Sequence, residues 1–174
     1  VIEGPLSRKN IVSIISNFIY FPDRSSEHEK YLSRYPQFYG AKDIYQSVLK
    51  NKRPHGDGKG GTYFGATGSG KTLTMLYLAK LLNNDNELKN PSIVVISDRT
   101  DLDDQISNLF LNSKNFIGDN NIVNVDSRKD LSEKLSNIKS GGVFMTTIQK
   151  FNKDIGVLSD RDNIICISDE AHRT

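Results

Sequence analysis

The sequence predicts an α/β domain in which a mainly parallel sheet is covered by helices on both faces, giving three layers. Three features indicate this class. Short apolar segments of strand length alternate with capped helical patterns between residues 92 and 169. A glycine-rich loop lies at residues 65–72, and an apolar segment at residues 164–168 ends in two acidic residues. Ligands of such sheets bind at the carboxyl ends of the strands, where both of these motifs fall.

The loop at residues 65–72 reads Gly-Ala-Thr-Gly-Ser-Gly-Lys-Thr and fits the phosphate-binding pattern G-x-x-x-x-G-K-[ST]. We expect Lys71 to act in catalysis by reaching the β- and γ-phosphate oxygens, and the Thr72 hydroxyl to bind Mg²⁺. The helix that begins at Lys71 would direct its positive end at the anion. A glycine-rich turn that matches by accident is the alternative, and the strand-like and helical flanks argue against it. The predicted nucleotide-binding residues of the loop are Gly65, Thr67, Gly68, Ser69, Gly70, Lys71 and Thr72.

The acidic pair Asp169 and Glu170 supplies what a bound triphosphate needs at the end of an apolar strand. We expect Asp169 to hold Mg²⁺ through water, and Glu170 to orient and deprotonate the attacking water. Taken alone, such a pair is more often a solvated start of a loop. Together the two motifs predict an enzyme that binds and hydrolyses a nucleoside triphosphate with Mg²⁺.

The first third of the chain is predicted to be helical with loops. Apolar residues repeat at helical spacing over residues 7–20, and Ser7 or Asn10 can cap this helix. Residues 22–34 are charged and serine-rich, which predicts a mobile connection. A second helical pattern covers residues 38–49, and a Gly/Lys loop follows at residues 51–61.

From residue 62 onward, strands and helices alternate. We expect strands at residues 62–64, 92–96, 122–125, 142–147 and 164–168. The expected helices cover residues 73–82, 101–111 and 128–138, with a short helix near Gln149. The predicted cap of the helix at residues 101–111 consists of Thr100 and Asp103. The predicted cap of the helix at residues 128–138 is Ser127.

Composition limits the remaining possibilities. A chain of 174 residues with 36% hydrophobic content can form one domain with a core, and a net charge of +2 neither predicts nor excludes nucleic-acid binding. Cys166, the single cysteine, is expected to be a small core residue, so a reducing, cytoplasmic location is predicted. No segment predicts a membrane span. Because the chain starts at Val1 and stops two residues after His172, we expect it to be part of a longer protein.

Several segments together resemble one known family. Asp169-Glu170-Ala171-His172 resembles the DEAH box of superfamily 2 helicases and translocases. Residues 95–105, which contain Asp-Arg-Thr-Asp-Leu-Asp-Asp-Gln, look like a segment of the restriction (motor) subunit of type I restriction-modification enzymes. Residues 146–151 and 169–174 are similar to the next two motifs of that family, and residues 34–37 resemble its upstream glutamine motif. The resemblance covers nearly the whole chain.

This resemblance implies a RecA-like P-loop NTPase fold, truncated after the DEAH motif. Residues 1–36 would be a helical pre-motor segment and linker, and residues 37–174 the first RecA-like ATPase domain, incomplete at its C-terminus. The implied function is an ATP- and Mg²⁺-dependent motor that translocates duplex DNA before cleavage by a nuclease domain outside this chain. The implied partners are duplex DNA and the methyltransferase and specificity subunits of a restriction-modification complex.

The resemblance also implies roles for residues outside the two ATPase motifs. Gln37 would recognise adenine, with Phe38 or Tyr39 stacking on the base; the alternative is that Gln37 is an exposed polar residue before a helix. Two neighbouring threonines and an arginine would contact DNA, although the threonines are also ordinary strand formers and the arginine can pair with nearby aspartates. A histidine would couple the ATP site to DNA, or else simply cap the strand. These four residues are Thr146, Thr147, Arg99 and His172.

Three other functions compete with this interpretation. Another superfamily 2 DNA or RNA helicase shares the DEAH box but not the segment at residues 95–105. A P-loop kinase or GTPase is disfavoured because Asn152-Lys153-Asp154-Ile155 lacks the last aspartate of a guanine-binding signature, and because Glu170 suits water activation. A non-catalytic nucleotide sensor is disfavoured by the intact Lys71, Thr72, Asp169 and Glu170.

Overall fold

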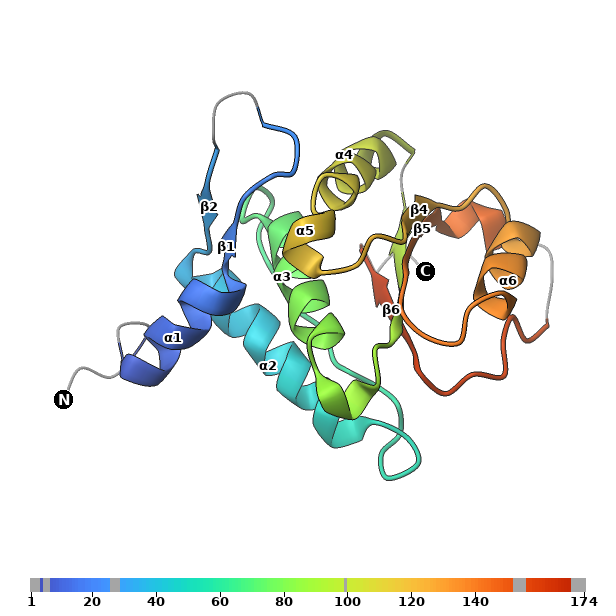
Figure 1. Cartoon of the computed structure of the whole chain (residues 1–174), viewed down its shortest axis with the longest axis horizontal. Helices are drawn as coiled ribbons and strands as arrows, with labels where there is room; N and C mark the ends of the chain where they lie inside the picture. The colour runs from blue at the N-terminus through green and yellow to red at the C-terminus, as the bar shows by residue number, and fades with distance from the viewer. Residues whose placement is uncertain (1–3, 5–6, 26–28, 99, 152–155, 170–174) are drawn as a thin grey trace. The chain divides into compact units, whose positions relative to one another are not determined.

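The computed structural model describes residue 4 and residues 7–25, 29–98, 100–151 and 156–169, apart from the side chains of residues 100–104. The chain forms two compact units, Val1–Leu82 and Asn83–Thr174. The first unit is mainly helical, and the second contains a parallel sheet with its helices (Figure 1). The boundary between residues 36 and 37 that the resemblance implies is a different division, and it stays a prediction.

In its described residues, the first unit is built from three helices that meet at aromatic side chains. These are α1 (Arg8–Asn17), α2 (Tyr35–Asn51) and α3 (Lys71–Asn83). Ser7 caps α1 by accepting a hydrogen bond from the backbone N–H of Asn10, which confirms one of the two predicted caps. Phe18, at the end of α1, is fully buried, and its ring lies 4.8 Å from Phe38 of α2 and 5.3 Å from Tyr77 of α3.

A small hairpin occupies part of the region that was predicted to be a helix end and a mobile connection. Strand β1 (Ile19–Tyr20) pairs antiparallel with β2 (Tyr31–Leu32). The rings of Tyr20 and Tyr31 stack with centroids 5.6 Å apart, and the Tyr77 hydroxyl donates to the Tyr31 carbonyl over 3.3 Å. The predicted helix over residues 7–20 therefore ends early, because this pairing and the Tyr20 ring contact draw residues 19–20 into a strand.

The predicted strand at residues 62–64 is wrong. The structure assigns these residues no strand, and the Phe64 side chain is 95% exposed. The segment instead packs against α2, where the ring of Tyr63 lies against Gly40. A strand needs a hydrogen-bonded neighbour, and the described residues of this unit offer these three none.

The second unit contains a four-stranded, all-parallel sheet with the order β4-β5-β3-β6. The strands are β3 (Ser92–Ser97), β4 (Ile122–Asn124), β5 (Val143–Thr147) and β6 (Ile164–Ser168), close to the predicted segments. The register aligns Ile93 with both Val143 and Ile165. Strand β5 is buried along its whole length, whereas β6 ends the sheet, pairs with β3 and is only partly buried.

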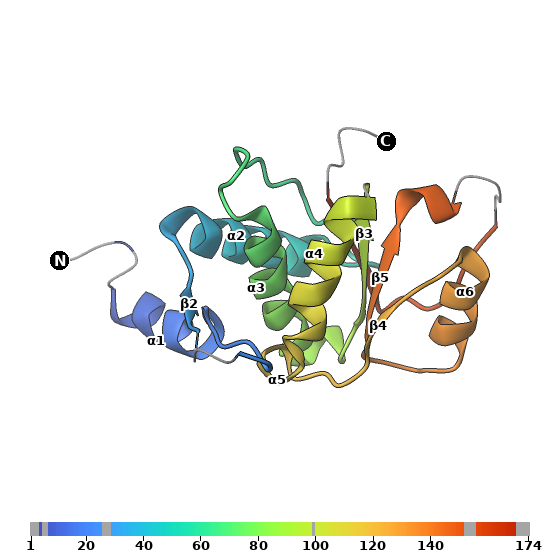
Figure 2. The ribbon, with the colours of Figure 1, turned by 90° about the horizontal axis from the view of Figure 1, so that it is seen from above.

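Helices cover both faces of this sheet, as predicted. Helix α4 (Thr100–Leu111) and helix α6 (Arg128–Ser136) lie on opposite sides of the strands (Figure 2). The α6 side chains Leu131 and Leu135 pack with Val94 of β3 and Phe144 of β5 in one buried cluster. Helix α4 packs against β3, β4 and β5 with Ile106 and Phe110 buried.

The short segments around these helices complete the unit. The structure adds α5 (Lys114–Ile117) and the short helix η1 (Asn86–Leu88), which the sequence pattern did not predict. The short helix predicted near Gln149 is confirmed as η2 (Ile148–Phe151). Ser127 caps α6 as predicted, by accepting from the backbone N–H of Asp130. The predicted Thr100 and Asp103 cap of α4 involves side chains outside the described part. No helix in the described part of the chain combines the length and apolar character needed to cross a membrane.

Arg161 fastens the amino-terminal ends of the strands to the end of α6. Its guanidinium donates to the carbonyls of Leu135 and Ile138 over 3.3 and 3.2 Å, and to the Ser92 hydroxyl at the start of β3 over 2.8 Å. Its Nε also donates to the Asn163 amide oxygen over 3.0 Å. Burial lowers the pKa of Arg161, while the charge of Asp162 acts in the opposite direction. A cation on the last carbonyls of a helix satisfies groups that have no partner within the helix.

Replacing Arg161 with alanine is expected to destabilise the domain by roughly 2–3 kcal/mol, because two peptide carbonyls and one hydroxyl lose a charged donor. Urea unfolding followed by circular dichroism measures this change. The matched control is Lys139→Ala, which removes an exposed cation close by. An equal shift of the unfolding midpoint in both variants would contradict the bridging role of Arg161.

Candidate functional site

The phosphate loop is a tight turn that leads directly into α3. The Ser69 N–H donates to the Ala66 carbonyl over 3.0 Å, and α3 begins at Lys71, as the motif predicts. Gly68 and Gly70 have φ values of 77° and 83°, in the left-handed region that residues with a Cβ rarely adopt. The loop therefore has the backbone shape for which its glycines were predicted to be needed.

The inside of this loop suits a phosphate group. Lys71 Nζ donates to the Gly65 carbonyl over 3.2 Å, so the ammonium already points into the loop. The Ser69 hydroxyl oxygen is buried and has no hydrogen-bond partner among the described residues. A Cβ added at Gly65 would lie only 2.7 Å from that oxygen and 3.3 Å from Lys71 Cγ. An unpaired donor, a lysine and the first turn of a helix fit an anion that a side chain at Gly65 would exclude.

Gln37 lies inside the structure and contacts the phosphate loop. It is 2% exposed, within the first turn of α2, which rules out the alternative of an exposed residue before a helix. Its Oε1 accepts from the Arg34 N–H over 2.7 Å, which closes a capping box, and its Nε2 donates to the Ser69 and Gly70 carbonyls over 3.3 and 3.2 Å. Both ends of the amide are thus engaged by the protein, and adenine recognition by Gln37 stays a prediction.

The structure also bears on the aromatic residues expected to stack on adenine. Phe38 is 1% exposed and its ring packs edge-on against Phe18, so of the two candidates Phe38 is not available to a base, and stacking by Tyr39 stays a prediction. Tyr39 is half-buried, with its ring 4.7 Å from that of Tyr35. Tyr35 is 63% exposed. Of the two residues expected to stack on adenine, Tyr39 therefore keeps some accessible surface, beside the exposed Tyr35 ring.

Several polar residues of the second unit lie at the carboxyl edge of the sheet. Asp169 follows β6 directly, and its N–H donates to the Ile96 carbonyl of β3 over 2.8 Å. Ser97 and Thr147 lie side by side in the register of β3 and β5. Asp169 therefore stands where three neighbouring parallel strands end, as the sequence predicts for a ligand-binding edge.

The two threonines predicted to contact DNA are buried at this edge. Thr146 is 1% exposed and Thr147 2% exposed. The Ser97 hydroxyl donates to the Thr146 carbonyl over 3.4 Å, whereas the Thr146 hydroxyl has no partner among the described residues. Their role in DNA binding stays a prediction, and their burial is what strand-forming threonines in a core would show.

Gln149 makes a contact between two strand ends that the sequence did not predict. Its side-chain amide donates to the carbonyl of Asp98, so the turn after β5 is tied to the residue that follows β3. The sequence predicts a short helix near Gln149 and a family motif at residues 146–151, but neither pattern assigns a role to the Gln149 side chain. Arg99, Glu170 and His172 lie outside the described residues.

Cys166 differs from the prediction of a core residue. It lies on β6, the last strand in the order of the sheet, and is exposed. Partial burial of the sulphur nevertheless raises the pKa of the Cys166 thiol.

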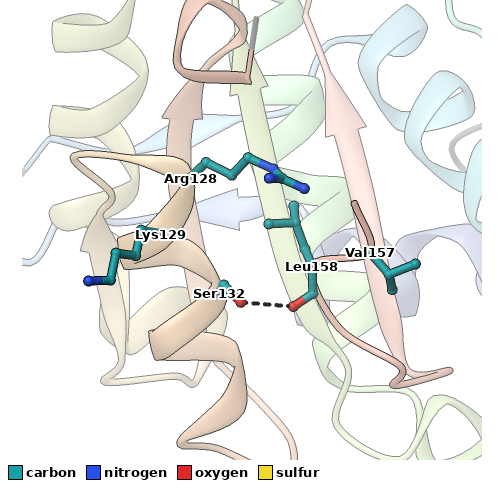
Figure 3. A pocket seen from close by; sticks show the side chains of 5 residues that line it. All are labelled: Arg128, Lys129, Ser132, Val157 and Leu158. Carbon is teal, nitrogen blue, oxygen red and sulfur yellow. Dashed lines mark hydrogen bonds between the residues drawn. The ribbon is translucent and has the colours of Figure 1, made fainter. Parts of the chain in front are cut away.

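Two hollows of the second unit lie away from the predicted site residues. One, of about 340 Å³, is lined by Arg128, Lys129, Ser132, Val157 and Leu158. Figure 3 shows it beside α6, where the Ser132 hydroxyl donates to the Leu158 carbonyl over 3.1 Å. The other, of about 290 Å³, lies over the apolar side chains of β3 and β6 and is lined by Arg161 and Cys166 among others. Neither hollow is lined by a residue of the phosphate loop or by Asp169.

Comparison with known proteins agrees with these motifs. The chain is 37% identical over 180 residues to the type I restriction enzyme HindI endonuclease subunit of Haemophilus influenzae, which covers 100% of this chain and 17% of that protein. It is 33% identical over 183 residues to a Methanocaldococcus jannaschii protein named "Putative type I restriction enzyme MjaIXP endonuclease subunit", covering 100% of this chain and 16% of the relative. The chain thus spans about a sixth of the length of these relatives.

The family model that describes the SWI2/SNF2 ATPase matches residues 36–174, from the glutamine motif through the phosphate loop to the acidic motif. This range contains both predicted ATPase motifs and the whole parallel sheet. The chain belongs to the SWI2/SNF2 ATPase family and is a helicase-like ATPase domain of the kind found in type I restriction endonuclease subunits.

Proposed function

We propose that this chain is the ATP-hydrolysing motor domain of a type I restriction endonuclease subunit and that it drives translocation of duplex DNA before cleavage. The observation that carries the proposal is the phosphate loop, in which the Lys71 ammonium donates to the Gly65 carbonyl and the buried Ser69 hydroxyl has no partner among the described residues. The identity to named restriction subunits supports the restriction role. Membership of the SWI2/SNF2 ATPase family argues against the alternative functions of a kinase or a GTPase.

The proposed chemistry assigns separate tasks to the two motifs. Lys71 and the loop N–H groups would bind the β- and γ-phosphates of ATP, and Thr72 and Asp169 would hold Mg²⁺, which neutralises charge on the phosphates. Glu170 would orient the attacking water and accept its proton. Phosphoryl transfer needs positioning and charge neutralisation more than covalent chemistry, so these few groups are the ones on which hydrolysis would depend.

The partners are also part of this proposal. We infer duplex DNA as the track, and methyltransferase and specificity subunits as the other members of a cytoplasmic restriction-modification complex. The names of the relatives support such a complex for those proteins. The nuclease activity would belong to a part of the protein outside these 174 residues.

Lys71→Ala is expected to abolish nucleotide binding, because it removes the only side-chain cation that the described part of the loop points inward. Binding of a fluorescent ATP analogue, followed by anisotropy, measures the effect. Lys50→Ala, which removes an exposed lysine in the last turn of α2, is the matched control and should bind like the wild type. Unchanged affinity in Lys71→Ala would remove the loop from the proposed site.

Glu170→Gln is expected to keep nucleotide binding and to slow hydrolysis roughly 10²–10⁴-fold, because the amide cannot accept the proton of the attacking water. Phosphate release at saturating ATP, measured beside analogue binding, separates the two effects. Equal loss of binding in Glu170→Gln and Lys71→Ala would contradict the assignment of Glu170 to water activation.

DNA dependence distinguishes the restriction motor from another helicase. We expect ATP hydrolysis by the intact protein, together with its partner subunits, to rise strongly with duplex DNA and little with single-stranded DNA or RNA. Hydrolysis should be measured with each nucleic acid, with and without the partner subunits. Stimulation by RNA or single strands alone would favour a different superfamily 2 helicase.

A further inference from the structure

Gly40 lies inside helix α2, where glycine is a poor choice. Glycine in the middle of a helix loses more backbone entropy on folding than alanine does, so its presence calls for a packing reason. The reason is contact with the segment before the phosphate loop. A Cβ at Gly40 would lie 2.6 Å from Cε2 and 2.8 Å from Cδ2 of Tyr63, closer than real Cβ atoms approach any neighbour.

The same tyrosine ring touches the phosphate loop with its other edge. Cε1 of Tyr63 lies 3.1 Å from the position that a Cβ would take at Gly65, the first residue of the loop. Gly65 in turn carries the carbonyl that accepts the Lys71 ammonium. The Tyr63 ring therefore fills the space between a glycine of α2 and the glycine that holds Lys71.

The far end of the loop is attached to the same helix through Gln37. Its Nε2 donates to the Ser69 and Gly70 carbonyls, and a Cβ at Gly70 would lie 2.2 Å from that nitrogen. The loop is thus fixed to α2 at two points, one turn apart on the helix. At one point the contact is polar, through Gln37, and at the other it is steric, through Tyr63 against Gly40.

We propose that Tyr63 is a positioning residue for nucleotide binding, and that its ring, seated against Gly40, sets the distance between α2 and the start of the phosphate loop. The inference rests on the proposed ATP-binding function and deepens it. A side chain at Gly40 would push the ring toward Gly65 and shift the lysine-binding carbonyl. The aromatic ring carries this role, so phenylalanine at position 63 would serve equally well.

A double-mutant cycle in the intact protein tests this coupling, with the dissociation constant of a fluorescent ATP analogue as the readout. We expect Gly40→Ala to weaken binding roughly tenfold, because displacement by a fraction of an ångström disturbs a positioned site. In the Tyr63→Ala background, where room for the methyl group exists, Gly40→Ala should have no further effect. Tyr63→Phe should bind like the wild type, and Gln46→Ala, at an exposed position of α2, is the helix control.

The outcomes separate this inference from the proposed function. If Gly40→Ala weakens binding equally in both backgrounds, or not at all, while Lys71→Ala abolishes it, the positioning role is wrong and ATP binding stands. If the wild type fails to bind the analogue, or binds it no better than Lys71→Ala, the proposed function itself fails. Thermal unfolding is measured for every variant. If Gly40→Ala does not fold, the affinities of Tyr63→Ala and Tyr63→Phe for the analogue are compared instead. Equal affinities of these two variants would overturn the proposal.

Discussion

The conformation of the phosphate loop depends on close contacts that only glycine, which has no Cβ, permits. Three glycines, at positions 40, 65 and 70, lie where the nearest atoms of other residues would collide with any side chain. These contacts bring the loop and the Tyr63 ring against helix α2, whose Gln37 amide donates to the loop carbonyls. The buried Ser69 hydroxyl and the inward Lys71 ammonium then follow from the shape of the loop. Such dense packing transmits a displacement at one point to the others, since protein interiors have few voids to absorb it.

The second unit divides its polar groups between the two ends of its sheet. At the amino ends, the Arg161 guanidinium donates to the Ser92 hydroxyl of β3, to the Asn163 amide oxygen before β6 and to two carbonyls at the end of α6. At the carboxyl ends, Asp169 and the Gln149 to Asp98 contact lie beside buried hydroxyls. The first end is closed by hydrogen bonds that serve stability. The second keeps an acidic residue at the mouth of the strands, which is where parallel sheets bind ligands.

The sequence was sufficient for the features that depend on local pattern. The four apolar strands, the helices α4 and α6 and the Ser7 and Ser127 caps could be predicted, because burial on both faces and capping leave a direct signature. The phosphate loop could also be predicted, from its sequence motif. Pairing and packing between distant residues could not be predicted: the hairpin of β1 and β2, the attachment of residues 62–64 to α2, and the burial of Phe38 arise from partners far along the chain. The exposed edge of β6, and with it Cys166, depends on which strands have neighbours.

The position of Cys166 allows a label to be attached close to the acidic motif. It is the one cysteine among the 174 residues, it is exposed, and it lies on β6 three positions before Asp169, which follows that strand. A maleimide fluorophore would therefore report on this strand alone. Because the thiolate is the reacting form and the pKa of this thiol is raised, conjugation proceeds slowly at neutral pH and faster in mildly alkaline buffer.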